Sequence, residues 1–196
     1  MKFQKEYYLC RFLKKYEIMS NFFYDLVKKR RSIRRFTDQS IEPEKIDLLM
    51  KTALMSPTSK SSMPWHFVLV DDKETLQRLS ESRTHGSQLI AGAALAIVIV
   101  ADTNLSTVWI EDASIASTFI QLQAEALGLG SCWVQVRERM KDDVQTTEDY
   151  VRQLLNIPEE LKVLNIIVLG YKSEERKPHD EEKLLFNRIH KGKFMS

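Results

Sequence analysis

The chain has 196 residues, 43% of them hydrophobic and 29% charged, and its 29 basic and 27 acidic residues leave a formal net charge of +2. This composition is typical of a globular domain and excludes disordered and fibrous chains, while the balanced charge excludes a strong overall attraction to polyanions. Cys10 and Cys132 are far apart in sequence, which predicts neither a disulfide framework nor a metal site and favours a reducing, cytoplasmic location. The longest apolar run, residues 89–101, is too short to span a bilayer, so we expect no membrane partner.

The first 18 residues mix charged and aromatic side chains and contain no uninterrupted apolar stretch, so they do not fit a secretory signal. Met19 offers an alternative start, which leaves open whether residues 1–18 are translated as an N-terminal extension. Because the chain contains neither a repeat nor a linker rich in proline or glycine, we expect residues 19–196 to form a single domain.

Two amphipathic helices are expected at the start of this domain. Apolar residues recur at helical spacing between residues 21 and 30 and again between residues 46 and 54. Pro43 suits the first turn of the second helix, where its missing N–H has no partner to lose, and Ser56-Pro57 ends that helix. The small and polar residues 56–64, bracketed by prolines, predict a loop.

The rest of the chain alternates strands with helices. Strands are expected at residues 66–70, 94–101, 131–136 and 161–170, and helices at 73–80, at 109–127 and from Thr146 or Thr147 onward. Apolar residues occupy nearly every side of 109–127, which is typical of a buried helix or of one in a subunit interface, and Gly128 and Gly130 are expected to end it. The pattern predicts an α+β or α/β fold with a covered sheet.

Residues 28–35, KKRRSIRR, carry six cations in eight positions and form what we call the cationic segment. Three interpretations are open: a solvated helix end, a nucleic-acid patch, or a cradle for a small anion such as phosphate. Guanidinium groups bind phosphate oxygens in pairs and a serine hydroxyl adds a further bond, which favours the cradle. Ser32 and Arg34 would then face the anion, while Ile33 and Phe36 anchor the turn in the core.

Four motifs occur in order along the chain: RRSIRRF at residues 30–36, SPTSKSSMPWHF at 56–67, WIEDAS at 109–114 and GLGSCWV at 128–134. Together they resemble the FMN-dependent nitroreductase family, over nearly the whole chain from Asn21 to the charged tail. The resemblance implies an α+β fold with a central, mostly antiparallel sheet covered by helices on both faces. It also implies an intertwined homodimer with FMN at its interface, in which Trp109 and Asp112 belong to the dimer core.

The resemblance further implies which residues bind FMN. Arg30 and Ser32 would hold its phosphate or ribityl chain, with Arg31 nearby, and Arg34 would face the pyrimidine edge of the ring, where a cation favours the reduced anion. The set is completed by the loop residues Pro57, Thr58, Ser59 and Ser61, by the turn residues Gly130 and Ser131, and by either Arg176 or Lys177. Ser61 and Met63 stand where the family usually has Asn and Gln, which bears on flavin affinity or tuning.

The implied activity is that of an oxidoreductase with tightly bound, non-covalent FMN. NADH or NADPH would deliver a hydride to flavin N5 and leave. A nitroaromatic, quinone or similar electron-poor acceptor would then take the electrons in a ping-pong cycle, so that no side chain has a catalytic role. Only TNLSTV separates Asp102 from Trp109, which leaves no room for a helical lid and predicts an open pocket with broad acceptor tolerance.

The same residues leave three other functions open. These are a specialised flavin chemistry such as dehalogenation or flavin breakdown, flavin binding without turnover, and nucleic-acid binding. The balanced charge argues against the last, so we expect a small-molecule acceptor and no nucleic-acid partner. The four histidines, His66, His85, His179 and His190, have no metal spacing and are assigned no chemical role. Cys132 is expected to be a small buried residue rather than a nucleophile.

Overall fold

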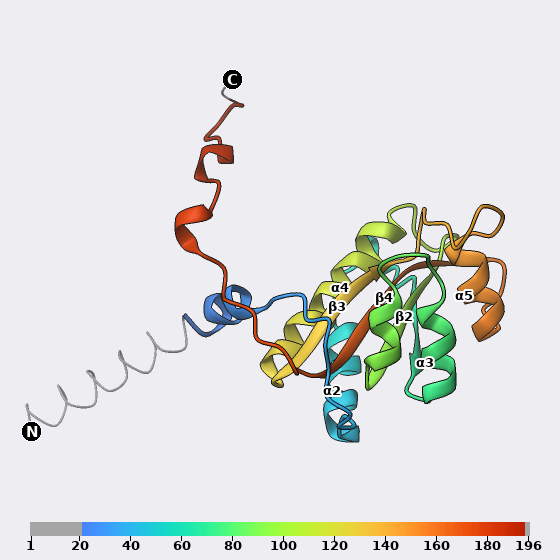
Figure 1. The fold of residues 1–196 in the computed structure, drawn as a ribbon. Coiled ribbons are helices and arrows are strands. Elements are labelled where there is room, and N and C mark those ends of the chain that lie inside the picture. Colours follow the sequence, from blue (N-terminus) through green and yellow to red (C-terminus); the bar gives the residue numbers. More distant parts are fainter. Residues whose placement is uncertain (1–20, 195–196) are drawn as a thin grey trace, which may run out of the picture.

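The structure is a computed structural model that describes residues 21–194, so the predicted extension of residues 1–18, with Cys10, lies outside it. Its body is one four-stranded sheet in the order β1-β2-β4-β3, in which every pairing is antiparallel. The strands are β1 (Trp65–Val70), β2 (Leu95–Asp102), β3 (Leu129–Gln135) and β4 (Leu161–Tyr171) (Figure 1). The predicted α+β class and antiparallel sheet are confirmed, and each predicted strand agrees with an observed one to within two residues at either end.

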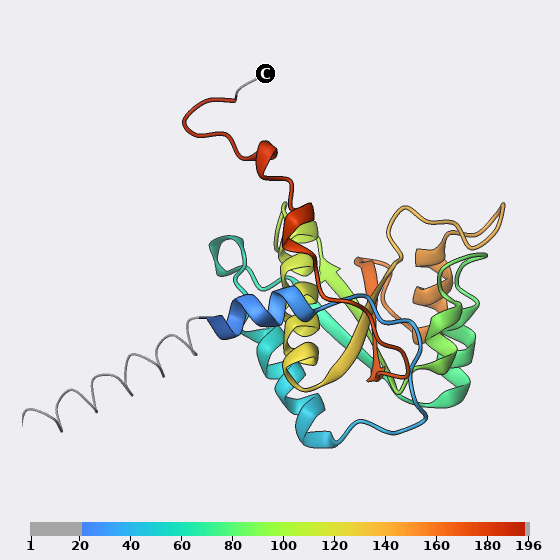
Figure 2. The same cartoon turned by 60° about the vertical axis from the view of Figure 1, so that its left-hand side comes forward.

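Helices cover both faces of the sheet, as Figures 1 and 2 show from two sides. One face carries α2 (Pro43–Leu54) and α4 (Trp109–Ala126), and the other carries α3 (Lys73–Ser80) and α5 (Thr147–Leu155). Residues 21–29 are also helical and lie beside α4 (Figure 2), whereas the residues after 180 extend away from the body (Figure 1). Among residues 21–194, no helix is long and apolar enough to cross a bilayer.

Residues 21–194 also contain four short 3₁₀ helices. They are η1 (Ser59–Ser61), η2 (Gln88–Gly92), η3 (Glu181–Lys183) and η4 (Phe186–Arg188). The first lies in the predicted loop between α2 and β1, and the last two lie in the charged tail after β4.

The core has two halves, one on each side of the sheet, because successive side chains of a strand point to opposite faces. β2 runs through the middle of the sheet, and its residues 95–101 are all buried, as their continuous apolar sequence predicts. Ile97 and Ile99 belong to the half beneath α2 and α4, whereas Val98 and Val100 belong to the half beneath α3 and α5.

Polar side chains cap the N-termini of α3 and α5, the two helices that form the layer on the second face of the sheet. Asp72 accepts a hydrogen bond from Thr75 N at 2.8 Å at the start of α3 and so caps this helix. Thr146 does the same for Asp149 N at 3.0 Å at the start of α5.

Glycine follows the long helix α4, which ends at Ala126. Gly128 has a φ of +76°, a conformation in which glycine is strongly favoured, and it turns the chain toward the sheet. The prediction that Gly130 also ends this helix is wrong, because β3 begins at Leu129 and Gly130 lies inside the strand. The physical reason for a glycine there is the close approach of another segment, described below.

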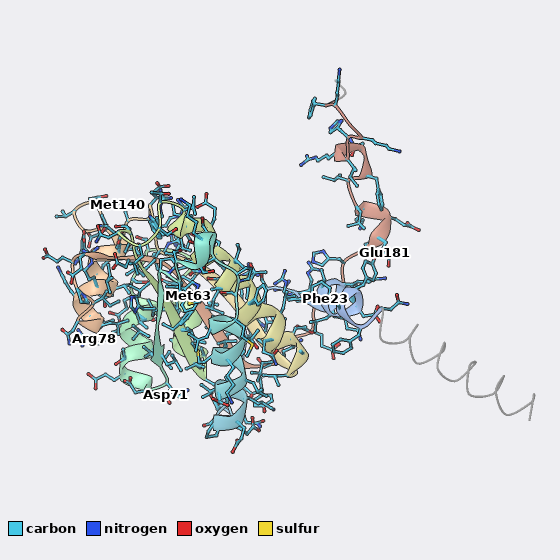
Figure 3. The ribbon with its side chains drawn as sticks, turned by 180° about the vertical axis from the view of Figure 1, so that it is seen from behind. Phe23, Met63, Asp71, Arg78, Met140 and Glu181 are labelled. Atoms are coloured by element: carbon cyan, nitrogen blue, oxygen red, sulfur yellow. The ribbon has the colours of Figure 1, made fainter. Side chains whose placement is uncertain are left out.

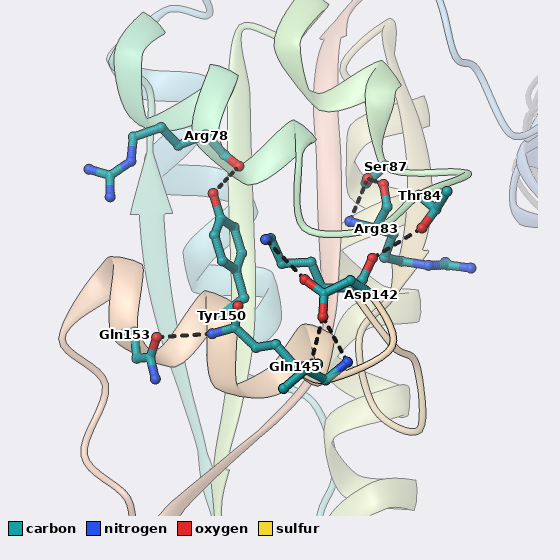
Figure 4. A network of polar contacts seen from close by, with 10 residues as sticks. Arg78, Arg83, Thr84, Ser87, Asp142, Gln145, Tyr150 and Gln153 are labelled. Carbon is teal, nitrogen blue, oxygen red and sulfur yellow. Dashed lines mark hydrogen bonds and ion pairs between the residues drawn. The ribbon is translucent and has the colours of Figure 1, made fainter.

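Polar contacts tie α3 to α5 and join the loops beside them (Figure 4). Tyr150 Oη donates to the Arg78 carbonyl at 3.0 Å, and Thr84 Oγ1 donates to the Lys141 carbonyl at 3.0 Å. These bonds connect parts of the second layer to one another, and the residues that make them lie outside the cationic segment and its neighbours.

β4 ends at Tyr171, whose hydroxyl joins the start of α2 to the sheet. Tyr171 Oη donates to Glu42 Oε2 at 2.6 Å, and Lys45 Nζ lies 3.2 Å from the same carboxylate oxygen. The hydrogen bond from Tyr171, followed by those from the Glu42 backbone and from Lys45, lowers the pKa of Glu42 from 4.5 to about 2.

Replacing Tyr171 with phenylalanine is therefore expected to destabilise the protein more at pH 7 than at pH 3. The pKa of Glu42 is lower in the folded than in the unfolded state, so its stabilising contribution is present above pH 4.5 and is lost as the pH falls toward about 2. Urea unfolding of both proteins at the two pH values measures the free-energy difference. Tyr150→Phe is the matched control, because its hydroxyl is bonded to a carbonyl that does not titrate; equal pH dependence in the two variants would contradict the prediction.

Candidate anion-binding site

The cationic segment leaves the helix of residues 21–29 and runs alongside the edge strand β3. Ile33 N donates to the Ser131 carbonyl at 2.9 Å, and Ser32 forms a parallel bridge with Ser131. The Ile33 side chain is buried at 2% exposure, Phe36 packs against the core, and Arg34 is exposed. Ile33 and Phe36 thus anchor the segment as expected.

The cationic segment can lie this close to β3 because residue 130 is a glycine. A Cβ atom built on Gly130 would lie 2.8 Å from Cγ2 of Ile33, closer than carbon atoms pack, and in a tight contact of 3.1 Å with Cγ of Lys172. Gly130 and Ser131 are both buried behind the cationic segment, and the space that the glycine leaves is taken by the Ile33 side chain.

The cationic segment and the chain after β4 together form a cavity of about 280 Å³. It is lined by Arg30, Arg31, Ser32, Arg34, Arg176 and His179. Five of these six residues are among those predicted to bind FMN. Lys177, the alternative to Arg176, lines a neighbouring cavity instead.

The donors in this cavity fit a phosphate monoester. Four guanidinium groups and one hydroxyl line it, and no carboxylate is found among the described residues that do so. Guanidinium groups are always charged and donate paired hydrogen bonds that match the spacing of phosphate oxygens. A phosphate group, with one to two negative charges, would meet an excess of positive charge and several hydrogen-bond donors here.

Several hydrogen bonds hold the chain after β4 against the cationic segment. They include those from Arg34 N to Glu174 Oε1 at 2.7 Å, from the Arg31 guanidinium to the Lys177 carbonyl, and from His179 N to the Lys28 carbonyl at 2.9 Å. Ser173 N also donates to the Arg35 carbonyl at 3.1 Å, and Lys28 Nζ to Glu181 Oε1. The bond from Arg34 N lowers the pKa of Glu174, which also accepts from Arg176 at 3.2 Å. Sequence reasoning identifies neither Glu174 nor His179, because the charged tail has no periodicity that could place its side chains.

Cys132 lies behind this cavity, within β3. Its side chain is only 3% exposed, and burial raises the pKa of the thiol, against a smaller lowering by the Arg34 guanidinium. A thiol that burial keeps protonated is a poor nucleophile, which agrees with the role expected for Cys132 as a small buried residue.

The second predicted set lies elsewhere, in the loop between α2 and β1. It consists of Pro57, Thr58, Ser59 and Ser61. The loop closes on itself, since Met63 N donates to Thr58 Oγ1 at 3.2 Å. None of these four residues lines the three cavities at the cationic segment, namely the one above and its two neighbours.

Asp112, in the first turn of α4, fixes this loop. Its side chain is 2% exposed, and its Oδ1 accepts a hydrogen bond from Ser59 N at 2.8 Å. Its Oδ2 accepts from Ser106 Oγ at 2.7 Å and from Ser62 Oγ at 3.4 Å. A buried carboxylate is stable only with such partners, so Asp112 and the loop determine each other's position.

Three residues of the loop hold a left-handed backbone without being glycine. Lys60, Ser61 and Met63 have φ values of 51°, 54° and 45°. Each such residue costs on the order of 1 kcal/mol, so the surroundings impose the shape of the loop. Met63 is also 56% exposed at the surface, where Figure 3 labels it.

Within one chain, this loop and the cationic segment lie at opposite ends of α4. Asp112 holds the loop at the first turn, whereas Glu125, near the last turn, pairs with Lys172 at 2.7 Å beside the cationic segment. At 1.5 Å per residue, the 13 steps from 112 to 125 correspond to about 20 Å. Figure 3 likewise shows Met63 well apart from Phe23, which precedes the cationic segment. A single chain therefore does not bring the two predicted sets together.

An apolar groove of about 290 Å³ lies between the helix of residues 21–29, α2 and α4. Its lining consists of Phe22, Phe23, Leu26, Thr52, Phe119, Leu122, Gln123 and Ala126. Phe22 and Phe23 are 63% and 62% exposed, so one face of α4 is only partly covered within the chain.

The family model described as the nitroreductase family matches residues 27–83 and 81–171 of this chain. Over 177 residues the chain is 37% identical to a protein of Archaeoglobus fulgidus named as an NADH dehydrogenase/NAD(P)H nitroreductase. That match covers 86% of this chain and 97% of the relative.

Solved structures show the same likeness. The FMN-dependent nitroreductase from Clostridium difficile R20291 matches with a TM-score of 0.85 and 48% identity, covering 86% of this chain and 98% of that one. The NADPH:FMN oxidoreductase from Vibrio harveyi, complexed with NAD⁺, is 21% identical and shares the fold, with a TM-score of 0.76 over 89% of this chain and 78% of that one.

Proposed function

This chain belongs to the nitroreductase family, and from that premise we propose that it is an FMN-dependent oxidoreductase that takes electrons from NAD(P)H. The observation that carries the proposal is the cavity in which four arginines and Ser32 meet, because FMN ends in a phosphate monoester and these donors suit one. The names of the relatives, which include FMN and NAD(P)H, support the same cofactor and donor.

We assign the phosphate of FMN to this cavity. Arg30, Ser32 and Arg176 would supply its hydrogen bonds, and Arg34 would place a permanent cation beside the flavin ring, its backbone fixed through Glu174. When bound, FMN supplies the redox chemistry by accepting a hydride and passing the electrons on. A fixed cation stabilises the negative charge that reduction adds to the site.

The acceptors we propose are nitroaromatic, quinone and similar electron-poor compounds, which would follow the nicotinamide product into the same site. The connection from β2 to α4 supports open access, because residues 103–108 form only a tight turn, with Asn104 N bonded to Asp102 Oδ1 at 2.8 Å. A turn of this length supplies no helical cover over the flavin.

We further propose that two copies of the chain form the complete site. A two-fold axis that pairs α4 with α4 in antiparallel orientation would place the loop of residues 57–61 from one copy beside the cationic segment of the other. The apolar groove, with its exposed Phe22 and Phe23, provides surface that such an interface would bury.

The test is an absorption spectrum of the protein purified without added flavin, followed by anaerobic addition of NADH and then NADPH. We expect a flavin band that at least one nucleotide bleaches, which identifies the donor. A band that neither nucleotide bleaches would refute NAD(P)H as the reductant. A colourless protein that FMN cannot reconstitute would refute the assignment of the cavity.

A further inference from the structure

His179 lines the proposed phosphate cavity, and neither the family motifs nor the assignments above give its side chain a part. Its backbone is fixed, because His179 N donates to the Lys28 carbonyl at 2.9 Å and the Arg31 guanidinium binds the carbonyl of Lys177 two residues earlier. The imidazole itself is exposed at the cavity wall. It is therefore held in place by main-chain contacts while its ring nitrogens are accessible to a ligand.

The charged groups around His179 come from both segments that form the cavity. The cations are Arg30, Arg31, Arg34 and Arg176 in the same cavity, and Lys177 and Lys183 in the neighbouring one. The carboxylates are Asp180, which lines the neighbouring cavity, Glu174, which is bonded to Arg34 N, and Glu181, which pairs with the cation of Lys28, the residue whose carbonyl binds His179 N. The surroundings are strongly positive until an anion enters, and a phosphate dianion reverses much of that charge.

We propose that His179 is a ligand of the FMN phosphate and that its imidazole takes up a proton from solvent when the cofactor binds, so that retention of FMN depends on pH. The inference rests on the proposed function, since it concerns the same cavity. Histidine changes its charge between pH 5 and 8, whereas arginine is charged throughout this range. Among the described residues that line the cavity, His179 is therefore the one that can couple phosphate binding to pH near neutrality.

The experiment compares wild-type protein with His179→Gln, whose side chain can still donate a hydrogen bond but cannot carry a charge. Flavin-free protein is titrated into FMN, and separately into riboflavin, at pH 6.5 and 8.0 and constant ionic strength, with flavin fluorescence as the readout. The variant is expected to raise the Kd for FMN by about tenfold at pH 6.5 and by less than about threefold at pH 8.0. Riboflavin, which lacks the phosphate, should bind both proteins equally at both pH values.

Calorimetry provides a second readout that a purely structural role would not change. Titration of FMN at pH 6.5 in two buffers of different ionisation enthalpy gives the number of protons taken up on binding. Wild-type protein should take up more protons than His179→Gln. His85→Gln is the matched control, since His85 is an exposed histidine in the loop between α3 and η2, outside the cavity, and should match wild type throughout.

The outcomes separate the two proposals. Wild-type protein that binds FMN, together with a variant that binds it equally well at both pH values, would overturn the role of His179 and leave the proposed function standing. A variant that loses FMN and riboflavin alike would show a structural role and would also overturn the inference. Wild-type protein that does not bind FMN would overturn the proposed function and the inference with it.

Discussion

Replacing Arg30 with methionine is expected to weaken the binding of FMN by about 10- to 100-fold and to leave the binding of riboflavin within about threefold. Arg30 lines the cavity in which Ser32 and Arg176 also lie, and its guanidinium would bind the phosphate directly. Hydrogen bonds to charged groups contribute about 1.5–3 kcal/mol each, and every 1.4 kcal/mol is a factor of ten in Kd. Flavin fluorescence titration of the two proteins measures both ligands.

Arg35→Met is the matched control for this prediction. Arg35 belongs to the same cationic segment but does not line the cavity, and its contact with Ser173 N uses the Arg35 carbonyl, which the substitution keeps. It should bind FMN as wild type does. Equal losses in the two variants would mean that the segment attracts anions only through its total charge, which is the behaviour expected of a nucleic-acid patch.

Co-expression of two inactive variants is expected to restore flavin binding to about a quarter of the wild-type content. One variant, Arg34→Glu, damages the cationic segment, and the other, Ser59→Trp, blocks the exposed loop at the opposite end of α4. If each site combines the loop of one chain with the cationic segment of the other, a mixed dimer has one intact and one doubly damaged site. Random pairing makes half of the dimers mixed. Because one of the two sites in each mixed dimer is intact, about a quarter of all sites can bind flavin.

The control is each variant expressed with a differently tagged copy of itself, which should hold no flavin. Purification through both tags isolates mixed dimers, and their flavin content should be about one per dimer. Mixed dimers without flavin would place the whole site within one chain. A Ser59→Trp protein that binds FMN normally on its own would remove the loop from the site.

Much of the body of this fold is predictable because its signals are local. β2 can be located from sequence because a strand in the middle of a covered sheet must be apolar on both sides, as residues 95–101 are. Asp72 and Thr146 mark the starts of α3 and α5 through side chains that bond their own helix. Gly130 could not be interpreted in this way, because its partner, Ile33, lies almost 100 residues earlier and only the folded chain brings the two together.

In the candidate site, too, the residues that are close in sequence could be predicted and those brought together by the fold could not. The sequence predicts an anion site at the cationic segment because its arginines and Ser32 are adjacent along the chain. Arg176 and His179 line the cavity, whereas Lys177 does not. Their positions depend on hydrogen bonds between the tail and the cationic segment, which no local sequence pattern indicates. The separation of the loop from the cationic segment follows from the length of α4, which a list of motifs does not convey.

The pairing of Ser32 with Ser131 has a consequence for solubility. β3 is an edge strand, and an uncovered edge presents unpaired N–H and carbonyl groups on which other chains can assemble. The cationic segment covers part of that edge with a backbone hydrogen bond and surrounds it with like charges that repel a second strand. The residues proposed to bind the phosphate thus also cover the edge of the sheet. Truncating them would uncover that edge, whereas single side-chain substitutions keep the main chain, and with it the covering hydrogen bond, in place.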